Sequence, residues 1–186
     1  LGVEASRRLL LVTGGSLGAL RLTRAVLEAL PAWAERADLA IHHVVGRRDW
    51  DAIAAATPSD LGALHYRAVD YEDDMPAVLA AADLVVCRSG SGTCFELAAM
   101  GLPAVLVPSP VVTADQQTRN AVHLVEAGGA RLVPDAELDG PRLVAEVDAI
   151  LGDPALLEAM RAGASSWAPV DAAAAVARLA EEHARG

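Results

Sequence analysis

The chain has 186 residues, enough for one well-buried domain and too few for two ordinary ones. Its apolar fraction of 53% is typical of helices packed on a parallel sheet and argues against disorder. The formal charge of -10 argues against a nucleic-acid partner, because phosphate binding requires a surplus of arginine or lysine. The chain contains no lysine, which excludes a Walker-A loop, Schiff-base chemistry and a pyridoxal anchor.

The two cysteines, Cys87 and Cys94, suit a reducing compartment and have no metal-binding spacing with the five histidines. We interpret both as buried structural residues, since free cysteine packs as a small apolar side chain. No apolar run reaches the ~18 residues that span a bilayer, and no signal-peptide pattern is present. The sequence therefore predicts a soluble cytoplasmic domain without a metal site.

Short apolar runs bounded by glycine and proline alternate along the chain with helical patterns. The predicted strands cover residues 8–13, 39–46, 63–69, 83–90, 103–108 and 130–134. The predicted helices cover residues 20–34, 49–56, 74–82, 93–100, 115–127, 141–151, 154–164 and 170–184. This order predicts a Rossmann-like, doubly wound α/β fold, with a parallel sheet of about six strands and a helical carboxyl-terminal region.

In a doubly wound sheet, ligands bind beyond the carboxyl ends of the strands, so the turns that follow the strands are the candidate sites. The first is "TGGSLGA", residues 13–19, where glycines admit a ligand close to the backbone and Ser16 offers a hydroxyl. An ordinary tight turn is the alternative. The pattern G-x-S-x-G also fits a hydrolase nucleophile elbow at Ser16, although such elbows normally follow a later strand.

The second candidate turn lies in "CRSGSGTCFELAAMGLP", residues 87–103. Arg88 ends the predicted strand, and a Ser-Gly-Ser-Gly stretch then leads into a helix, which suits an anion. Glu96 has two interpretations. It either forms a capping box with Thr93, or it accepts the vicinal hydroxyls of a ribose, as acidic residues do in dinucleotide-binding folds.

The third candidate is "ADQQTRNA", residues 114–121, which holds all the carboxamide side chains of the chain: Gln116, Gln117 and Asn120. Gln116 and Asn120 are four residues apart, so they share a helix face, whereas Gln117 is turned about 100° away. Carboxamides both donate and accept hydrogen bonds without charge, which suits sugar hydroxyls. The alternative is a helix capped by Asp115 with solvated amides.

Taken in order, "GGSLGA", the segment 73–108 and "ADQQTRNA" resemble the carboxyl-terminal half of the MurG family of GT-B glycosyltransferases, glycosyltransferase family 28. The resemblance runs from about residue 8 to about residue 184. It implies one half of a GT-B fold, with residues 1–7 as a linker remnant and residues 8–186 as the UDP-sugar-binding domain. Members of that family transfer N-acetylglucosamine from UDP-GlcNAc to lipid I, with inversion and without a metal or other cofactor.

The resemblance also implies roles for individual residues. Ser16 would contact the diphosphate of the donor, Glu96 would accept the two ribose hydroxyls, and backbone near Glu72 would bind the uracil edge with Arg88 close by. Backbone around Ser91, Gly92 and Thr93 would complete the phosphate site. Gln116 and Asn120 would contact the N-acetylglucosamine ring.

The sequence departs from the family pattern at Ser91 and Gly92, and at Val111 and Val112, which bears on sugar specificity more than on nucleotide binding. The acceptor half, with the catalytic base and the contact to the inner face of the membrane, is expected to lie outside this chain, which alone would bind without turnover. Two other functions stay open. One is the donor domain of another GT-B enzyme with a lipid or natural-product acceptor, and the other is a hydrolase that uses Ser16.

Overall fold

The computed structural model describes residues 2–15, 18–112, 115–168 and 172–184. Six strands form one parallel sheet in the order β3-β2-β1-β4-β5-β6. They are β1 (Arg8–Thr13), β2 (Leu39–Val44), β3 (His65–Val69), β4 (Leu84–Cys87), β5 (Ala104–Leu106) and β6 (Ala130–Leu132). The predicted doubly wound α/β fold is therefore confirmed.

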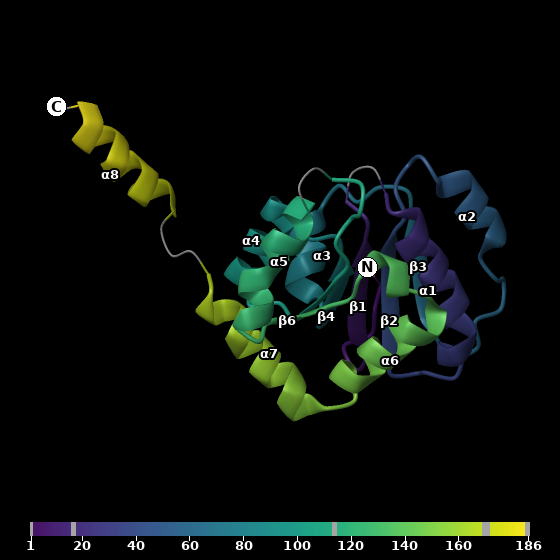
Figure 1. Ribbon diagram of the computed structural model, residues 1–186. Coiled ribbons are helices and arrows are strands. Elements are labelled where there is room, and N and C mark those ends of the chain that lie inside the picture. The colour runs from purple at the N-terminus through teal and green to yellow at the C-terminus, as the bar shows by residue number, and fades with distance from the viewer. Residues whose placement is uncertain (1, 16–17, 113–114, 169–171, 185–186) are drawn as a thin grey trace.

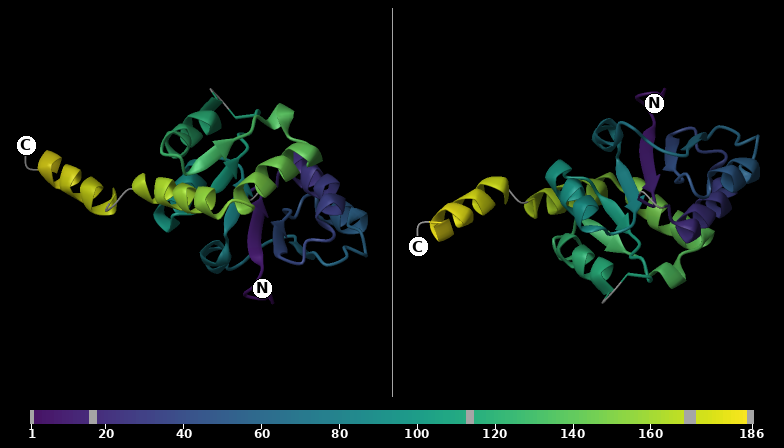
Figure 2. Two further views of the ribbon diagram at one scale, coloured as in Figure 1. Left: turned by 90° about the horizontal axis from the view of Figure 1, so that it is seen from below. Right: turned by 90° about the horizontal axis from the view of Figure 1, so that it is seen from above.

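Helices follow the strands in alternation and then continue alone (Figure 1). They are α1 (Leu20–Trp33), α2 (Trp50–Ala56), α3 (Met75–Ala81), α4 (Ser91–Met100), α5 (Gln116–Glu126), α6 (Gly140–Leu151), α7 (Pro154–Ser166) and α8 (Ala172–Ala184). A short 3-10 helix, η2 (Asp135–Glu137), follows β6 and was not predicted. Helix α8 extends away from the rest of the molecule in every view (Figures 1 and 2).

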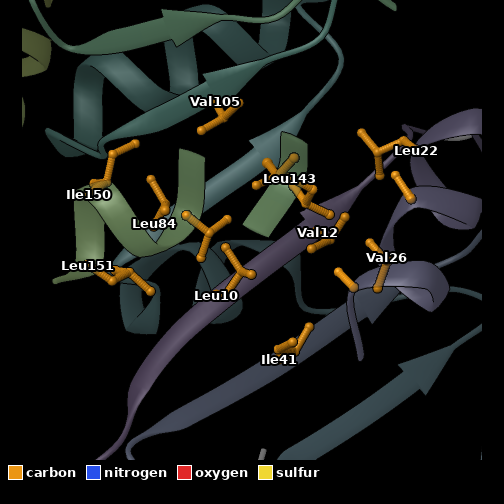
Figure 3. Close-up of a cluster of buried hydrophobic side chains, with 14 of the residues drawn as sticks. Leu10, Val12, Leu22, Val26, Ile41, Leu84, Val105, Leu143, Ile150 and Leu151 are labelled. Carbon is orange, nitrogen blue, oxygen red and sulfur yellow. The ribbon is translucent and has the colours of Figure 1, made fainter. Parts of the chain in front are cut away.

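Two apolar cores lie on opposite faces of the sheet, because successive strand side chains point to opposite sides. Leu10 and Val12 of β1 face α1 and α6, where they pack with Leu22 and Leu143 (Figure 3). Leu11 faces the other side, in the core formed with α3, α4 and α5. The central strands are buried on both faces, which explains why they read as continuous apolar runs in the sequence.

The strand order reverses between β1 and β4, which lie side by side at the centre of the sheet. The chain proceeds from β1 toward β3 in one direction and from β4 toward β6 in the other. At such a switch point the loops that follow the two central strands diverge and leave a crevice at the carboxyl edge. The turns after Thr13 and Cys87 therefore flank the site that the topology provides.

Several predicted boundaries were wrong by a few residues. Helix α4 begins at Ser91 rather than at Thr93, because Gly90 already occupies the N-cap position. Thr93 and Glu96 therefore lie inside the helix, and neither side chain caps its first turn. Asp115 is the N-cap residue of α5, but it makes no capping hydrogen bond to the helix backbone and instead accepts one from the Thr118 hydroxyl at 2.7 Å.

Candidate functional site

Two adjoining cavities lie at the carboxyl edge of the sheet, beside the switch point. The larger has a volume of about 560 Å³ and the smaller about 230 Å³. Thr13, at the end of β1, and Thr93, in the first turn of α4, line both cavities. The two threonines therefore mark where a ligand that occupied both cavities would pass from one to the other.

The amino-terminal ends of α1 and α4 both reach the larger cavity, through Ala19, Leu20, Gly90 and Thr93. Among the described residues, neither N-cap residue, Ala19 of α1 or Gly90 of α4, makes a side-chain capping bond. By contrast, α6 and α7 are capped by the carboxylates of Asp139 and Asp153. The first-turn amides of α1 and α4 therefore receive no capping bond from these two residues, and both helix dipoles favour an anion in the cavity.

Close packing explains two of the glycines in the turn after β1. A Cβ atom on Gly14 would lie 2.4 Å from the Ala19 backbone nitrogen, inside the start of α1. Gly18 has a φ of +72°, and a Cβ there would lie 2.7 Å from the Val45 carbonyl oxygen. These glycines let the turn fold tightly against both α1 and the end of β2, which leaves the cavity open above it.

Three arginines line the larger cavity, and the structure pairs each of them with a carboxylate. Arg48 lies 2.8 Å from Asp49, while Arg21 and Arg88 both contact Asp135, at 3.1 and 2.7 Å. Arg88 Nη1 also donates to the carbonyl oxygens of residues 107 and 108, at 3.0 and 3.1 Å. Arg88 therefore ties the end of β4 to the loop after β5 and to η2.

The smaller cavity brings Glu72, Thr93 and Glu96 together. Glu72 is held in the turn after β3 by two contacts: Oε2 lies 2.9 Å from His42 Nε2, and Oε1 accepts from the Asp74 backbone N–H at 3.1 Å. The Asp74 N–H chiefly lowers the pKa of Glu72, with a further contribution from His42. Burial lowers the pKa of His42, so a neutral imidazole beside an ionised Glu72 fixes this wall of the cavity.

Arg88 and Glu72 lie in different cavities, Arg88 in the larger and Glu72 in the smaller. Glu96 is exposed and lines the smaller cavity next to Thr93. Ser91 and Gly92 are exposed in the first turn of α4, and a Cβ on Gly92 would meet nothing within 4 Å. Ser16 lies outside the described residues, so neither its predicted diphosphate contact nor its hydrolase role is tested here.

The amides of α5 take positions that differ from those expected. Gln117 was predicted to be turned away from the helix face of Gln116 and Asn120, and it is this residue that lines the larger cavity, where its Oε1 accepts from the Ser109 backbone N–H at 2.8 Å. Asn120 Nδ2 donates to the Ser89 carbonyl at 3.0 Å, and the buried Ser89 hydroxyl donates to the Gln117 carbonyl at 2.8 Å. Gln116 is exposed at the first position of the helix.

The inner face of α5 explains this orientation. Ala121 and Leu124 are buried in the core, and Gln117 precedes them at helical spacing on the same stripe. The apolar stripe was visible in the sequence and would have placed Gln117 correctly. Thr13 belongs to the first predicted turn, although it was given no role of its own, whereas Arg21, Arg48 and Asp135 were missed and had no sequence signal.

Both cysteines are buried, and burial raises the pKa of each thiol, that of Cys94 to about 11. Within the described residues, no group of three or more histidine, cysteine, aspartate or glutamate side chains is arranged to hold a metal ion. No described helix combines the length and apolar character needed to cross a membrane.

A doubly wound α/β sheet with helix amino termini at its switch-point cavity has the architecture in which such folds commonly bind phosphorylated ligands. The chain belongs to the glycosyltransferase family 28 C-terminal domain, whose family profile matches residues 9–181. It forms one half of a GT-B fold.

Similar proteins agree with this assignment. The chain is 42% identical, over 96% of its length, to the UDP-N-acetylglucosamine–N-acetylmuramyl-(pentapeptide) pyrophosphoryl-undecaprenol N-acetylglucosamine transferase of Corynebacterium efficiens, and 41% identical over 99% of its length to that of Mycobacterium ulcerans. It covers 47% and 46% of those relatives, or about half their length. The crystal structure of Acinetobacter baumannii MurG superposes with a TM-score of 0.83 at 29% identity, covering 97% of this chain and 51% of that one.

Proposed function

We propose that this chain is the donor-binding half of a MurG-type enzyme, which transfers N-acetylglucosamine from UDP-GlcNAc to lipid I in peptidoglycan synthesis. The observation that carries the proposal is the pair of helix amino termini, of α1 and α4, at one cavity beside the switch point. The names of the curated relatives supply the donor and the transferred group. The full enzyme would act at the inner face of the cell membrane.

In this proposal the diphosphate of UDP occupies the larger cavity and the uridine occupies the smaller one. The first-turn amides of α1 and α4, with Ser16 and the backbone of Ser91, Gly92 and Thr93, bind the phosphates. Glu96 accepts the two ribose hydroxyls, and backbone near Glu72 binds the uracil edge. Arg88 supports the site from the larger cavity, through the loop after β5.

Gln116 and Asn120, at the start of α5, are proposed to contact the N-acetylglucosamine ring. Carboxamides discriminate among sugars because they can donate to one hydroxyl and accept from another. We add Gln117 to this group, because Gln117 lines the larger cavity, in which the proposed diphosphate would be joined to the sugar. The contact between Asn120 and Ser89 suggests that Asn120 also fixes the turn that binds phosphate.

The chemistry of such a site is stabilisation of the leaving group. Breaking the bond between the sugar and UDP places additional negative charge on the diphosphate, and helix amides already oriented toward that position stabilise it without reorganising. The base that deprotonates the acceptor hydroxyl would come from the amino-terminal acceptor half of the enzyme, which also binds lipid I.

Calorimetric titration of the chain with UDP, UDP-GlcNAc, UDP-galactose and ADP tests this function. We expect UDP and UDP-GlcNAc to bind, UDP-galactose to bind more weakly than UDP-GlcNAc, and ADP not to bind measurably. Equal binding of ADP and UDP would reject the proposed uridine site. A serine-directed phosphonate probe that labelled Ser16 while UDP failed to bind would instead favour the hydrolase.

A further inference from the structure

The larger cavity is less positive than its arginines suggest. Each of the three described arginines that line it is paired within the chain, and two of them, Arg21 and Arg88, share the single carboxylate of Asp135. Asp135 itself lines the cavity, and only 12% of its side chain is exposed. A site proposed to hold a diphosphate therefore contains a carboxylate that competes with the ligand for the same two cations.

The contacts of Asp135 are electrostatic rather than aligned hydrogen bonds. Its Oδ1 is buried and has no hydrogen-bond partner in the described structure, although Arg88 Nη1 lies 2.7 Å away. Its Oδ2 lies 3.1 Å from Nε of Arg21, whose side chain is 51% exposed. Arg88 has two other acceptors, the carbonyls of residues 107 and 108, so its position does not rest on Asp135 alone.

Apart from its contacts with Arg21 and Arg88, the carboxylate of Asp135 has no other structural role among the described residues. It is the first residue of η2, and its side chain makes no capping bond there. Its backbone carbonyl accepts from the Leu138 N–H, a bond that any residue at this position would keep. Replacing the carboxylate by an amide of the same shape would thus leave the local backbone unchanged.

We propose that Asp135 is a counter-ion that sets how strongly the site holds an anion. The inference rests on the proposed function, because it takes a nucleoside diphosphate as the ligand. Asp135 partly neutralises Arg21 and Arg88, so the diphosphate gains less from them than from free cations. A transferase must release UDP after each turnover, and a restrained positive potential shortens the time that UDP stays bound. Asp135 is a positioning residue rather than a catalytic one.

The test compares Asp135→Asn with the unchanged chain for three probes: UDP, inorganic pyrophosphate and uridine. We expect the variant to bind UDP and pyrophosphate about threefold to tenfold more tightly at about 50 mM salt, and uridine equally well. This gain in affinity should be smaller at about 500 mM salt, because salt screens the attraction between the phosphates and the two arginines that have lost their counter-ion. The variant should also unfold at a lower temperature, since the largely buried Arg88 loses a counter-ion.

Controls separate this role from simple support of the site. Glu137→Gln removes the same charge from the same 3-10 helix, where Glu137 pairs with Arg142 outside the cavity, and should leave all three affinities unchanged. Asp135→Glu should restore the affinities of the unchanged chain. Asp135→Ser provides a second neutral variant and should shift binding in the same direction as Asp135→Asn.

Weaker or unchanged pyrophosphate binding in both neutral variants would overturn the inference, because a purely supporting residue would give that result. So would equal tightening for uridine, which carries no phosphate. Failure of the unchanged chain to bind UDP would reject the proposed function instead, and the pyrophosphate comparison would still decide the role of Asp135.

Discussion

Glu96 and Gln116 offer the most direct separation of nucleotide binding from sugar binding. Glu96 is an exposed carboxylate on the wall of the smaller cavity, whereas Gln116 is a neutral amide at the first position of α5. Hydrogen bonds to a charged group contribute about 1.5–3 kcal/mol each, and neutral ones about 0.5–1.5 kcal/mol. The two residues should therefore differ in which ligand they affect and in how much.

We predict that Glu96→Ala weakens UDP and UDP-GlcNAc alike, by about 10- to 100-fold for one lost charged hydrogen bond. Gln116→Ala should weaken only UDP-GlcNAc, by about 2- to 10-fold. Calorimetry with both ligands on both variants measures this. An equal loss of UDP and UDP-GlcNAc affinity in Gln116→Ala would remove the sugar-contacting role, while Glu96→Gln shows how much of the effect at Glu96 depends on charge.

Asn120 has a structural task that can be measured without any ligand. Its Nδ2 donates to the carbonyl of Ser89, a residue with no exposed surface in the turn after β4. We expect Asn120→Asp, which keeps the shape but loses the donor, to lower the free energy of unfolding by about 1–3 kcal/mol, the cost of a buried unsatisfied carbonyl. Urea unfolding measures this. Gln116→Ala, one helical turn earlier and exposed, serves as the control and should change stability by less than about 0.5 kcal/mol.

At the scale of single elements, the capping of α7 gives a further prediction. Asp153 accepts from the backbone N–H groups of residues 155 and 156, at 3.0 and 3.1 Å, and α7 buries Leu157 and Met160 in the core. Asp153→Ala should lower the free energy of unfolding by about 1 kcal/mol. Asp153→Ser should cause a much smaller loss, because serine also caps a helix. Neither variant should change UDP affinity, because α7 does not line either cavity. A loss of UDP binding in proportion to the loss of stability would contradict this separation.

Element order and type were predictable because β1, β4 and β5 are short apolar runs, and helices such as α1, α5 and α6 have a periodic apolar face. Strand ends were less predictable: the run 83–90 was predicted as strand, but β4 is Leu84–Cys87, and Gly90 already occupies the N-cap position of α4. The orientation of α5 was predictable from its apolar stripe, Ala121 and Leu124, but not from the spacing among its amides, and its contact with Ser89 had no sequence signal. The ion pairs of Asp135 join β4, α1 and η2, residues far apart in the chain, so no local pattern could indicate them.

At the scale of the whole molecule, the two cores and the site share the central strands. Strand β2, between β1 and β3, carries His42 and His43 on opposite faces of the sheet, because neighbouring strand residues alternate. His42 supports Glu72 at the smaller cavity, while His43 lies on the opposite face, with Nδ1 2.9 Å from the Tyr66 hydroxyl. Both histidines are almost fully buried, so they couple the stability of the whole domain to pH.

Burial lowers the pKa of His43 from its ordinary value of 6.5 to about 4. Above pH 6.5 the imidazole is neutral in both the folded and the unfolded chain and does not change stability with pH. As the pH falls from 6.5 toward 4, the unfolded chain takes up a proton that the folded chain does not, so stability decreases. The decrease attributable to His43 should reach about 3 kcal/mol near pH 4, at about 1.4 kcal/mol for each pKa unit.

Urea unfolding of the chain at intervals between pH 7.5 and about pH 4 measures this dependence. We expect His43→Asn to be less stable at pH 7.5, because it disturbs a fully buried strand, but to lose less stability on acidification. Carboxylates contribute to the acid response of both proteins, so the difference between the two slopes isolates His43. His42 contributes with the same sign, since burial lowers its pKa as well, and it remains in both proteins. Parallel pH curves for the two proteins would show that His43 takes up no proton on unfolding. Its burial would then not explain the acid sensitivity of the domain.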